Sequence, residues 1–185
     1  VRRDIENNDV SGLLKALGEV DSFVKMITAA VLDDPLIQAR LKGVGVLKKE
    51  DAIDLCVVGP TARASGLPID VRRDHPYAAY DKVDWKVITQ EEGDVFAKAV
   101  VRLLELTESV NIVRQCLKRM PKGEIEIKVR EIPPGEGIGT HEAPRGEVLH
   151  YVRSNGGNFP ERLKIRAPSY MNVPSFKKTV IGQDI

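Results

Sequence analysis

The sequence predicts an α+β protein, in which the long amphipathic helices of a helix-bundle body are followed by a small antiparallel sheet. Two patterns support this fold class. In two long segments before residue 121, apolar residues recur every three or four positions, which is the spacing of one helix face. After residue 123, apolar residues alternate with polar ones, as in a half-buried strand. We therefore expect a mostly helical part over residues 1–123 and a small antiparallel β part over residues 124–185.

Two long helices are expected in the first part. Ser11 should cap the first helix, because its hydroxyl can accept a free backbone N–H of the first turn, and Pro35 should end it. The second helix should span about residues 91–120 and end before Pro121 and Gly123. Their apolar stripes are Leu13, Leu17, Val20, Val24, Ile27 and Val31 in the first helix and Phe96, Val100, Leu103, Thr107, Val110 and Leu117 in the second. Helices with such stripes tend to pack side by side.

A long ordered loop over residues 59–86 is expected between these helices, after a short helix around Lys48 to Leu55. The loop is rich in Pro, Gly, Arg and Asp and has neither helical nor strand periodicity. Loops of this length are usually functional or disordered, and the aromatic residues Tyr77, Tyr80 and Trp85 favour packing over disorder.

The second part is expected to contain strands. Ile125, Ile127 and Val129 alternate with charged residues and predict the first of them. Two further segments with strand character, residues 147–153 and 162–166, flank the sequence Asn155-Gly156-Gly157. Because an Asn-Gly pair readily supplies positive φ values, we expect a tight hairpin turn between them.

The composition argues against several classes of protein. Of the 185 residues, 42% are hydrophobic and 30% are charged, which is far from the composition of a disordered chain. The 28 Lys and Arg residues nearly balance the 27 Asp and Glu residues, and a net charge of +1 argues against a binder of nucleic acid or of membrane surfaces. Apolar stretches are shorter than the roughly 18–20 residues of a membrane span. Without an initiator Met or a signal peptide, the chain is expected to be a soluble, intracellular piece of a longer protein.

Residue spacing alone points to no catalytic or metal site. The glycine-rich run over residues 135–139 lacks the following helix that a phosphate-binding loop needs, because Pro144 and Gly146 come soon after it. The three histidines have no metal-ligand spacing, and Cys56 and Cys116 form no Cys-x-x-Cys pair. We expect both cysteines to be free, buried thiols. No arrangement of Ser, His and an acid indicates a hydrolase.

Two blocks of the sequence carry more information. The first reads GPTARASG over residues 59–66 and continues through DVRR at 70–73 to HPYAAYD at 75–81. The second reads EAPRGE over residues 142–147, then HY at 150–151 and KIRAPS at 164–169, with Asn172 after it. In order and spacing these blocks resemble the large subunit of membrane-bound, energy-converting NiFe hydrogenases. They also resemble the related 49 kDa quinone-site subunit of respiratory complex I.

The resemblance implies a role for one residue in particular. In the hydrogenases, the Arg of the Ala-Pro-Arg-Gly loop reaches towards the diatomic ligands of the NiFe centre, and its match here is Arg145. A guanidinium is always charged and presents a rigid fork of donors, which suits a position beside a metal centre. We therefore expect Arg145 to be a catalytic residue of the parent protein. In the alternative interpretation, Arg145 pairs with Glu142 or Glu147 and braces the hairpin.

The chain also departs from the hydrogenase pattern. The family holds its metal with an early and a late Cys-x-x-Cys pair, and this sequence has neither. If the chain is an internal fragment, those pairs lie before Val1 and after Ile185. We therefore expect this chain to bind no cofactor and no nickel, and the NiFe centre to belong to the full-length parent.

The resemblance leaves more than one function open. The complex I subunit lacks those cysteines and more often has Lys at the position of Arg145, whereas Ala64 and the run over residues 75–81 are typical of the hydrogenase branch. We therefore favour a fragment of the catalytic subunit of a NiFe hydrogenase, which oxidises H2 or reduces protons. The alternatives are the 49 kDa-type subunit of an NADH:quinone oxidoreductase, which binds quinone, and a metal-free scaffold module.

The resemblance also implies partners and a location. These are a small iron-sulfur subunit and membrane subunits, with the assembly on the cytoplasmic, inner face of the cell membrane. No nucleic acid and no membrane span of the chain's own are expected. Alone, the chain should be inactive.

Overall fold

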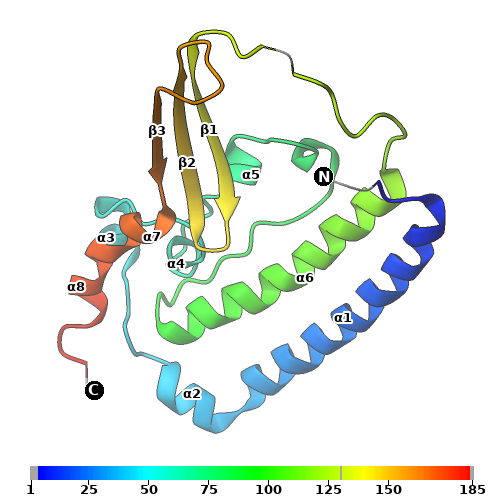
Figure 1. Ribbon diagram of the computed structural model, residues 1–185. Coiled ribbons are helices and arrows are strands. Elements are labelled where there is room, and N and C mark those ends of the chain that lie inside the picture. Colours follow the sequence, from blue (N-terminus) through cyan, green and yellow to red (C-terminus); the bar gives the residue numbers. More distant parts are fainter. Residues whose placement is uncertain (1–3, 130, 184–185) are drawn as a thin grey trace.

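Two long helices form one side of the molecule. The computed structural model describes residues 4–129 and 131–183. Helix α1 (Asn7–Asp33) and helix α6 (Val95–Arg119) run in opposite directions and pack against each other, as the apolar stripes predicted (Figure 1). The stripe of α1 is only partly covered, because Val24 is buried while Leu13 and Val20 are exposed.

The start of α1 differs from the prediction. The cap is Glu6, which forms a reciprocal capping box with Asp9: the Glu6 N–H donates to the Asp9 carboxylate at 3.1 Å. Ser11 was the wrong residue, because it lies inside the helix and its hydroxyl donates to the Asn8 carbonyl instead. An acidic side chain satisfies the free N–H groups of a first turn as well as a hydroxyl does, so the cap lies five residues earlier than predicted.

The end of α1 follows the prediction. The helix stops at Asp33, and Pro35 is the first residue of the next helix, α2 (Pro35–Leu41). The Asp34 carboxylate accepts the N–H groups of Leu36 and Ile37, so it caps this new helix.

Single helical turns make up much of the segment between α2 and α6. Helix α3 (Lys49–Asp54) confirms the short helix expected there. The predicted loop is ordered, but it is not free of regular structure, because it contains α4 (Pro60–Arg63), α5 (Val71–Asp74) and the 3-10 turn η1 (Tyr80–Lys82). Its aromatic residues do pack: Trp85 is buried, and the rings of Tyr77, Tyr80 and Trp85 contact one another in sequence.

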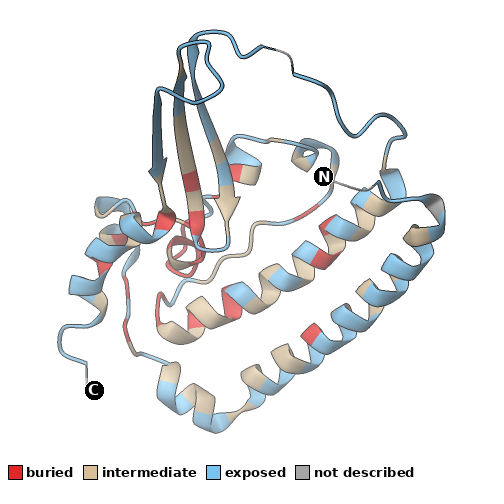
Figure 2. Cartoon of the chain, in the orientation of Figure 1, coloured by how far each residue is buried: buried red, intermediate tan, exposed pale blue. Residues whose placement is uncertain are grey.

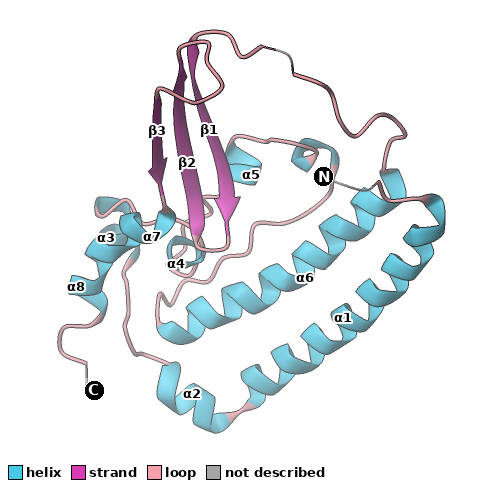
Figure 3. Ribbon diagram, viewed as in Figure 1, coloured by secondary structure: helices cyan, strands magenta, loops and turns pink. Residues whose placement is uncertain are grey.

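The sheet has three antiparallel strands in the order β1-β2-β3, which are β1 (Gly135–Ala143), β2 (Gly146–Ser154) and β3 (Arg162–Arg166). The strand predicted at Ile125, Ile127 and Val129 is wrong. That segment is part of the loop between α6 and β1 (Figure 3), and Ile127 is 78% exposed. An alternating pattern becomes a strand only when a neighbouring strand pairs with it, and the glycine-rich run from residue 135 takes that place beside β2.

The two hairpins of the sheet have different turns. Pro144 and Arg145 alone join β1 to β2, since Ala143 pairs with Gly146. Strands β2 and β3 pair as predicted, but their connection runs over residues 155–161 and is not a tight two-residue turn. Asn155 is not among the described residues with a positive φ, and its carboxamide oxygen instead accepts the N–H of Gly157.

Short helices complete the chain after the sheet. Helix α7 (Pro168–Asn172) contacts β2 and continues through the 3-10 turn η2 (Val173–Ser175) into α8 (Phe176–Thr179). Residues 124–185 therefore contain helices as well as strands. The division at residue 123 stays a prediction.

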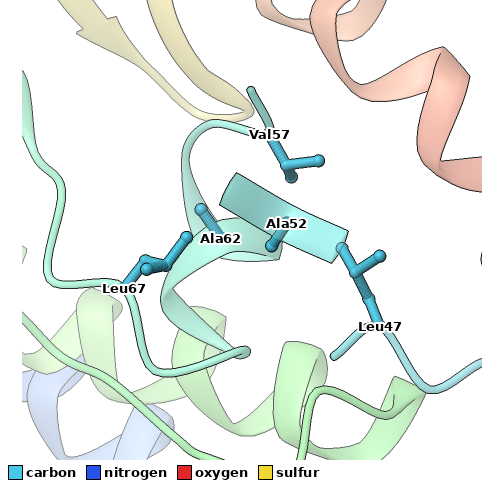
Figure 4. Packing of buried hydrophobic residues seen from close by; sticks show 5 residues of the cluster. All are labelled: Leu47, Ala52, Val57, Ala62 and Leu67. Atoms are coloured by element: carbon cyan, nitrogen blue, oxygen red, sulfur yellow. The ribbon is translucent and has the colours of Figure 1, made fainter. Parts of the chain in front are cut away.

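The core gathers around α4 and the adjoining end of the sheet, as the red residues of Figure 2 show. One cluster consists of Leu47, Ala52, Val57, Ala62 and Leu67, and Figure 4 shows these side chains gathered around α3 and α4. A second joins Ala64 of the loop to Ala97 and Val101 of α6.

The cysteines lie outside this core. Cys56 and Cys116 are free thiols as expected, but both are exposed, which corrects the prediction of burial. Cys56 takes a left-handed φ of 51° just after α3, and its side chain is exposed although the next residue, Val57, is buried. None of the described helices is long and apolar enough to cross a membrane.

We predict that Leu47→Ala lowers the free energy of unfolding by about 2–5 kcal/mol, because the side chain is 1% exposed and its removal leaves a cavity in the first cluster. The matched control is Leu36→Ala on α2, where the side chain is 66% exposed and the change should stay within about 0.5 kcal/mol. Urea unfolding of both variants measures the difference. Equal losses would contradict the position of this core.

Candidate functional site

A buried arginine lies where α4, α6 and the sheet meet. Arg63, from the GPTARASG block, is 1% exposed. Its Nε donates to the Glu105 carboxylate of α6 at 2.6 Å, and its Nη1 donates to the Glu142 carboxylate of β1 at 2.9 Å. The same Nη1 also donates to the Ile69 carbonyl at 2.9 Å. One guanidinium therefore bonds to three separate parts of the chain.

Asp70 extends this cluster to a second arginine. Its carboxylate lies 3.3 Å from Arg63 Nη1 and accepts two bonds from Arg72, at 2.9 Å from Nε and 2.7 Å from Nη2. It also accepts the backbone N–H of Arg72 and so caps α5. The second Glu142 oxygen accepts the N–H of Val71 at 3.4 Å, which ties β1 to the start of this short helix.

The cluster combines two guanidinium groups with the carboxylates of Asp70, Glu105 and Glu142. Charges out of water are tolerated when they are paired, and here each of the two guanidinium groups bonds to at least one carboxylate. Burial raises the pKa of the Glu142 carboxyl above its ordinary value, and repulsion from Asp70 adds to this, while the charge of Arg63 opposes it.

The backbones of the two sequence blocks touch at a pair of glycines. Gly59 has a φ of 69°, and a Cβ on it would overlap the Arg145 carbonyl and the Cα of Gly146. Gly146 has a φ of 123°, and a Cβ there would come within 2.8 Å of the Gly59 nitrogen. Glycine is needed at both positions, for the left-handed conformation and for the close approach.

Asn172 holds the same junction from a third direction. Its carboxamide oxygen accepts the N–H of Val58 at 3.0 Å, and its Nδ2 donates to the Val58 carbonyl at 3.2 Å. The same Nδ2 donates to the Arg145 carbonyl at 3.4 Å. Gly59 of the first block, Gly146 of the second block and Asn172 therefore meet at one point and position the backbone of Arg145.

The Arg145 side chain faces a cavity of about 630 Å³. Charged side chains dominate its lining: Arg63, Arg72, Arg102, Glu105, Glu142 and Arg145. The acids proposed as partners of Arg145 in the alternative interpretation are bonded elsewhere, Glu142 to Arg63 and Glu147 to Arg166. Within residues 4–129 and 131–183, no carboxylate lies within ion-pair distance of the Arg145 guanidinium.

The other residues considered as ligands do not gather at this cavity. The rings of His141 and His150 stack across β1 and β2 with centroids 5.9 Å apart, but His75 is not part of that pair. The described part of the chain has no group of three His, Cys, Asp or Glu side chains placed to hold a metal ion. The glycine-rich run at 135–139 lies in strand β1 and does not lead into a helix.

The donor set of these residues does not fit a NiFe centre. Such a centre needs several thiolates close together, whereas Cys56 follows α3 and Cys116 lies on α6, and both are exposed.

Sequence reasoning singled out Arg145 and missed the residues that support it. Glu105 lies in a helix whose pattern predicted only packing, and nothing in its neighbourhood marks it as a partner of Arg63. Arg63 did carry a signal, because it is a charged residue enclosed by small residues between Pro60 and Gly66, which is typical of a tightly packed segment. Asn172 was noted only as part of a motif.

We predict that Gly59→Ala lowers the free energy of unfolding by about 1–3 kcal/mol, because the new methyl group overlaps the backbone of the Arg145 turn and the residue has a positive φ. Gly139→Ala is the matched control: its Cβ would meet open space on β1, so the change should stay within about 0.5 kcal/mol. Chemical denaturation of both variants provides the measurement. A Gly59→Ala protein as stable as the control would show that the two blocks do not touch.

A second prediction concerns pH. The unfolded chain releases the Glu142 proton at the ordinary pKa, and the folded chain releases it at a higher pH. The carboxyl therefore favours the folded state most when protonated, and this contribution is lost as the pH rises from the ordinary value through the raised pKa. Relative to Glu142→Gln, which does not titrate, the wild-type free energy of unfolding should fall across that range. Parallel stability curves for the two proteins would refute the raised pKa.

Comparison with known proteins identifies the family. The model of the respiratory-chain NADH dehydrogenase 49 kDa subunit family matches residues 1–132 and 127–185. A carbon monoxide-induced hydrogenase of Rhodospirillum rubrum is 43% identical over 174 residues, which cover 91% of this chain and 48% of that protein. An NADH-quinone oxidoreductase subunit of Deinococcus radiodurans is 34% identical over 208 residues, covering 97% of this chain and 52% of that protein.

The fold has a close counterpart among solved structures. A chain in the structure of the membrane-bound sulfane sulfur reductase, an archaeal respiratory membrane complex, superposes with a TM-score of 0.92 at 30% identity. The match covers 100% of this chain and 52% of that one, so the chain spans about half the length of the relatives it matches. The chain belongs to the family of the 49 kDa subunit of respiratory-chain NADH dehydrogenase.

Proposed function

We propose that this chain is part of the catalytic subunit of a NiFe hydrogenase-type oxidoreductase, which oxidises H2 or reduces protons, and that Arg145 lies beside its metal site. The relative named as a hydrogenase is 43% identical to this chain, compared with 34% for the NADH-quinone oxidoreductase subunit of Deinococcus radiodurans. Arg145, rather than Lys, is also the residue that the hydrogenase branch has in this loop.

One observation carries the role of Arg145. Its backbone is fixed by the Gly59–Gly146 contact and by Asn172, while its guanidinium has no carboxylate partner among the described residues. A fixed backbone with an unpaired fork of donors is the arrangement expected of a residue that binds something in the cavity. A bracing arginine would instead bond to neighbouring carboxylates, as Arg63 does to Glu105 and Glu142.

The residues of this chain would supply hydrogen-bond donors and charges to the site, and they would not ligate a metal. Arg145 would donate hydrogen bonds into the cavity, and Arg63 would keep the Glu142 and Glu105 carboxylates in place along its wall. Since the thiolates of a NiFe centre would have to come from outside this chain, we propose that residues 1–185 alone are inactive.

Further subunits follow from the same proposal. The structural counterpart is part of a respiratory membrane complex, which supports membrane subunits as partners. A small iron-sulfur subunit as electron partner, and a position on the cytoplasmic face of the membrane, rest on the hydrogenase resemblance. A net charge of +1 supports the absence of a nucleic-acid partner.

A second candidate function is a subunit of an NADH:quinone oxidoreductase. It is favoured by the matching family model and by an NADH-quinone oxidoreductase subunit of Chloroherpeton thalassium, which is 39% identical over 171 residues and covers 77% of this chain. In that case Arg145 would serve a site without NiFe. The metal-free scaffold module remains the third interpretation.

Arg145→Lys in the complete protein tests the first proposal. Lysine keeps the charge but loses the planar fork, so H2-dependent dye reduction should fall roughly 10- to 100-fold while nickel and iron contents stay unchanged. Arg40→Lys on α2, an exposed position away from the cavity, is the control and should retain activity.

Unchanged activity in the Arg145→Lys protein would remove Arg145 from the mechanism. A complete protein that holds no nickel and shows NADH-dependent quinone reduction, with no H2-dependent activity, would replace the hydrogenase proposal with the second candidate.

A further inference from the structure

The charged cavity has an excess of positive groups. Its lining includes the guanidinium groups of Arg63, Arg72, Arg102 and Arg145, but only the carboxylates of Glu105 and Glu142. Asp70, which lies behind the wall, takes up Arg72 through two hydrogen bonds. With that third carboxylate included, the four arginines and three carboxylates leave a net charge of +1 in the cluster.

Arg102 and Arg145 are the two arginines of this cavity that form no ion pair with a described carboxylate. The carboxylates of Glu105 and Glu142 accept from Arg63, at 2.6 and 2.9 Å. Arg102 donates from Nη1 to the Lys98 carbonyl at 2.9 Å, which holds the guanidinium but does not neutralise it. Within the described residues, neither Arg102 nor Arg145 has a carboxylate within ion-pair distance.

Two like charges face the same cavity at this point. Burial lowers the pKa of the Arg102 guanidinium, and repulsion from Arg145 and Arg63 lowers it further, while Glu105 opposes the shift. Such repulsion is relieved when an anion binds between the charges. The two side chains also come from independent elements, Arg102 from α6 and Arg145 from the turn between β1 and β2, and both elements are anchored to Arg63.

We propose that Arg102 and Arg145 form a binding subsite for a small oxyanion, a carboxylate or a tetrahedral oxyanion such as sulfate. A guanidinium offers parallel N–H donors that match a pair of anionic oxygens, and two of them converging on one cavity can hold such a group from two sides. The cavity volume of about 630 Å³ accommodates an ion of this size together with water. The inference goes beyond the proposed function, because it concerns a further ligand of the same cavity and depends on no metal.

The two other arginines of the cavity, Arg63 and Arg72, are not part of this subsite, because both are bonded within the protein. Arg63 bonds to two carboxylates and a carbonyl, and Arg72 bonds to Asp70, so both help to build the wall of the cavity. Arg102 and Arg145 remain partly open to solvent, and neither forms an ion pair with a described carboxylate. Removing them should therefore change binding more than stability.

Calorimetric titration of the purified protein with sodium sulfate and with sodium acetate tests the subsite, at an ionic strength kept constant with sodium chloride. We expect saturable binding of at least one of these ions. In Arg102→Gln/Arg145→Gln the dissociation constant should rise roughly tenfold or more, because hydrogen bonds to charged groups are lost. The matched control, Arg40→Gln/Lys118→Gln, removes the same total charge outside the cavity and should bind like the wild type.

The Lys variants Arg102→Lys and Arg145→Lys guard against a variant that fails to fold, because they keep the charge and should still weaken binding through loss of the fork. Tighter binding of acetate would assign the subsite to carboxylates, and tighter binding of sulfate to tetrahedral oxyanions. Absence of saturable binding for both ions, or equal weakening in the control pair, would overturn the proposal. Because these titrations involve no turnover, they can fail while the Arg145→Lys activity test succeeds, and the reverse.

Discussion

The architecture depends on the burial of Arg63. A guanidinium that is 1% exposed has to be compensated by the protein itself, and the compensating groups come from far apart in the chain: Asp70 before α5, Glu105 on α6 and Glu142 on β1. The arginine therefore acts as a cross-link between the helical pair, the loop of short helices and the sheet. Removing one partner would leave an uncompensated charge in the interior. The positions of α4, α6 and β1 therefore depend on one another.

A second constraint is purely steric. At Gly59 and Gly146 the backbones of the two sequence blocks approach so closely that a Cβ would overlap the opposite chain. Asn172 bonds to both backbones, at Val58 and at Arg145. These contacts place the turn of Arg145 through its main chain. The contacts that place this turn therefore do not involve the Arg145 side chain. Its charge can act on the cavity that Arg145 lines together with Arg102.

The comparisons and the geometry support each other at this point. The matched family and a TM-score of 0.92 to a chain of a respiratory membrane complex account for the fold. The convergence of the sequence blocks explains why they occur together in the chain: each supplies part of one junction. The groups around this junction include two arginines, Arg102 and Arg145, without carboxylate partners among the described residues.

The sequence by itself determined the local elements whose pattern is long or chemically specific. The stripes of α1 and α6, the short helix α3 and the strands β2 and β3 could be predicted, because periodicity over many residues reports which face of an element is apolar. The resemblance also pointed to Arg145. Tertiary structure decided the features that need a partner from elsewhere in the chain. Residues 125–129 alternate like a strand but form a loop, because β1 is the strand that pairs with β2. Tertiary structure also left Cys56 and Cys116 exposed, and it brought Glu105 to Arg63, because burial and ion pairing arise from elements distant in sequence that no local pattern encodes.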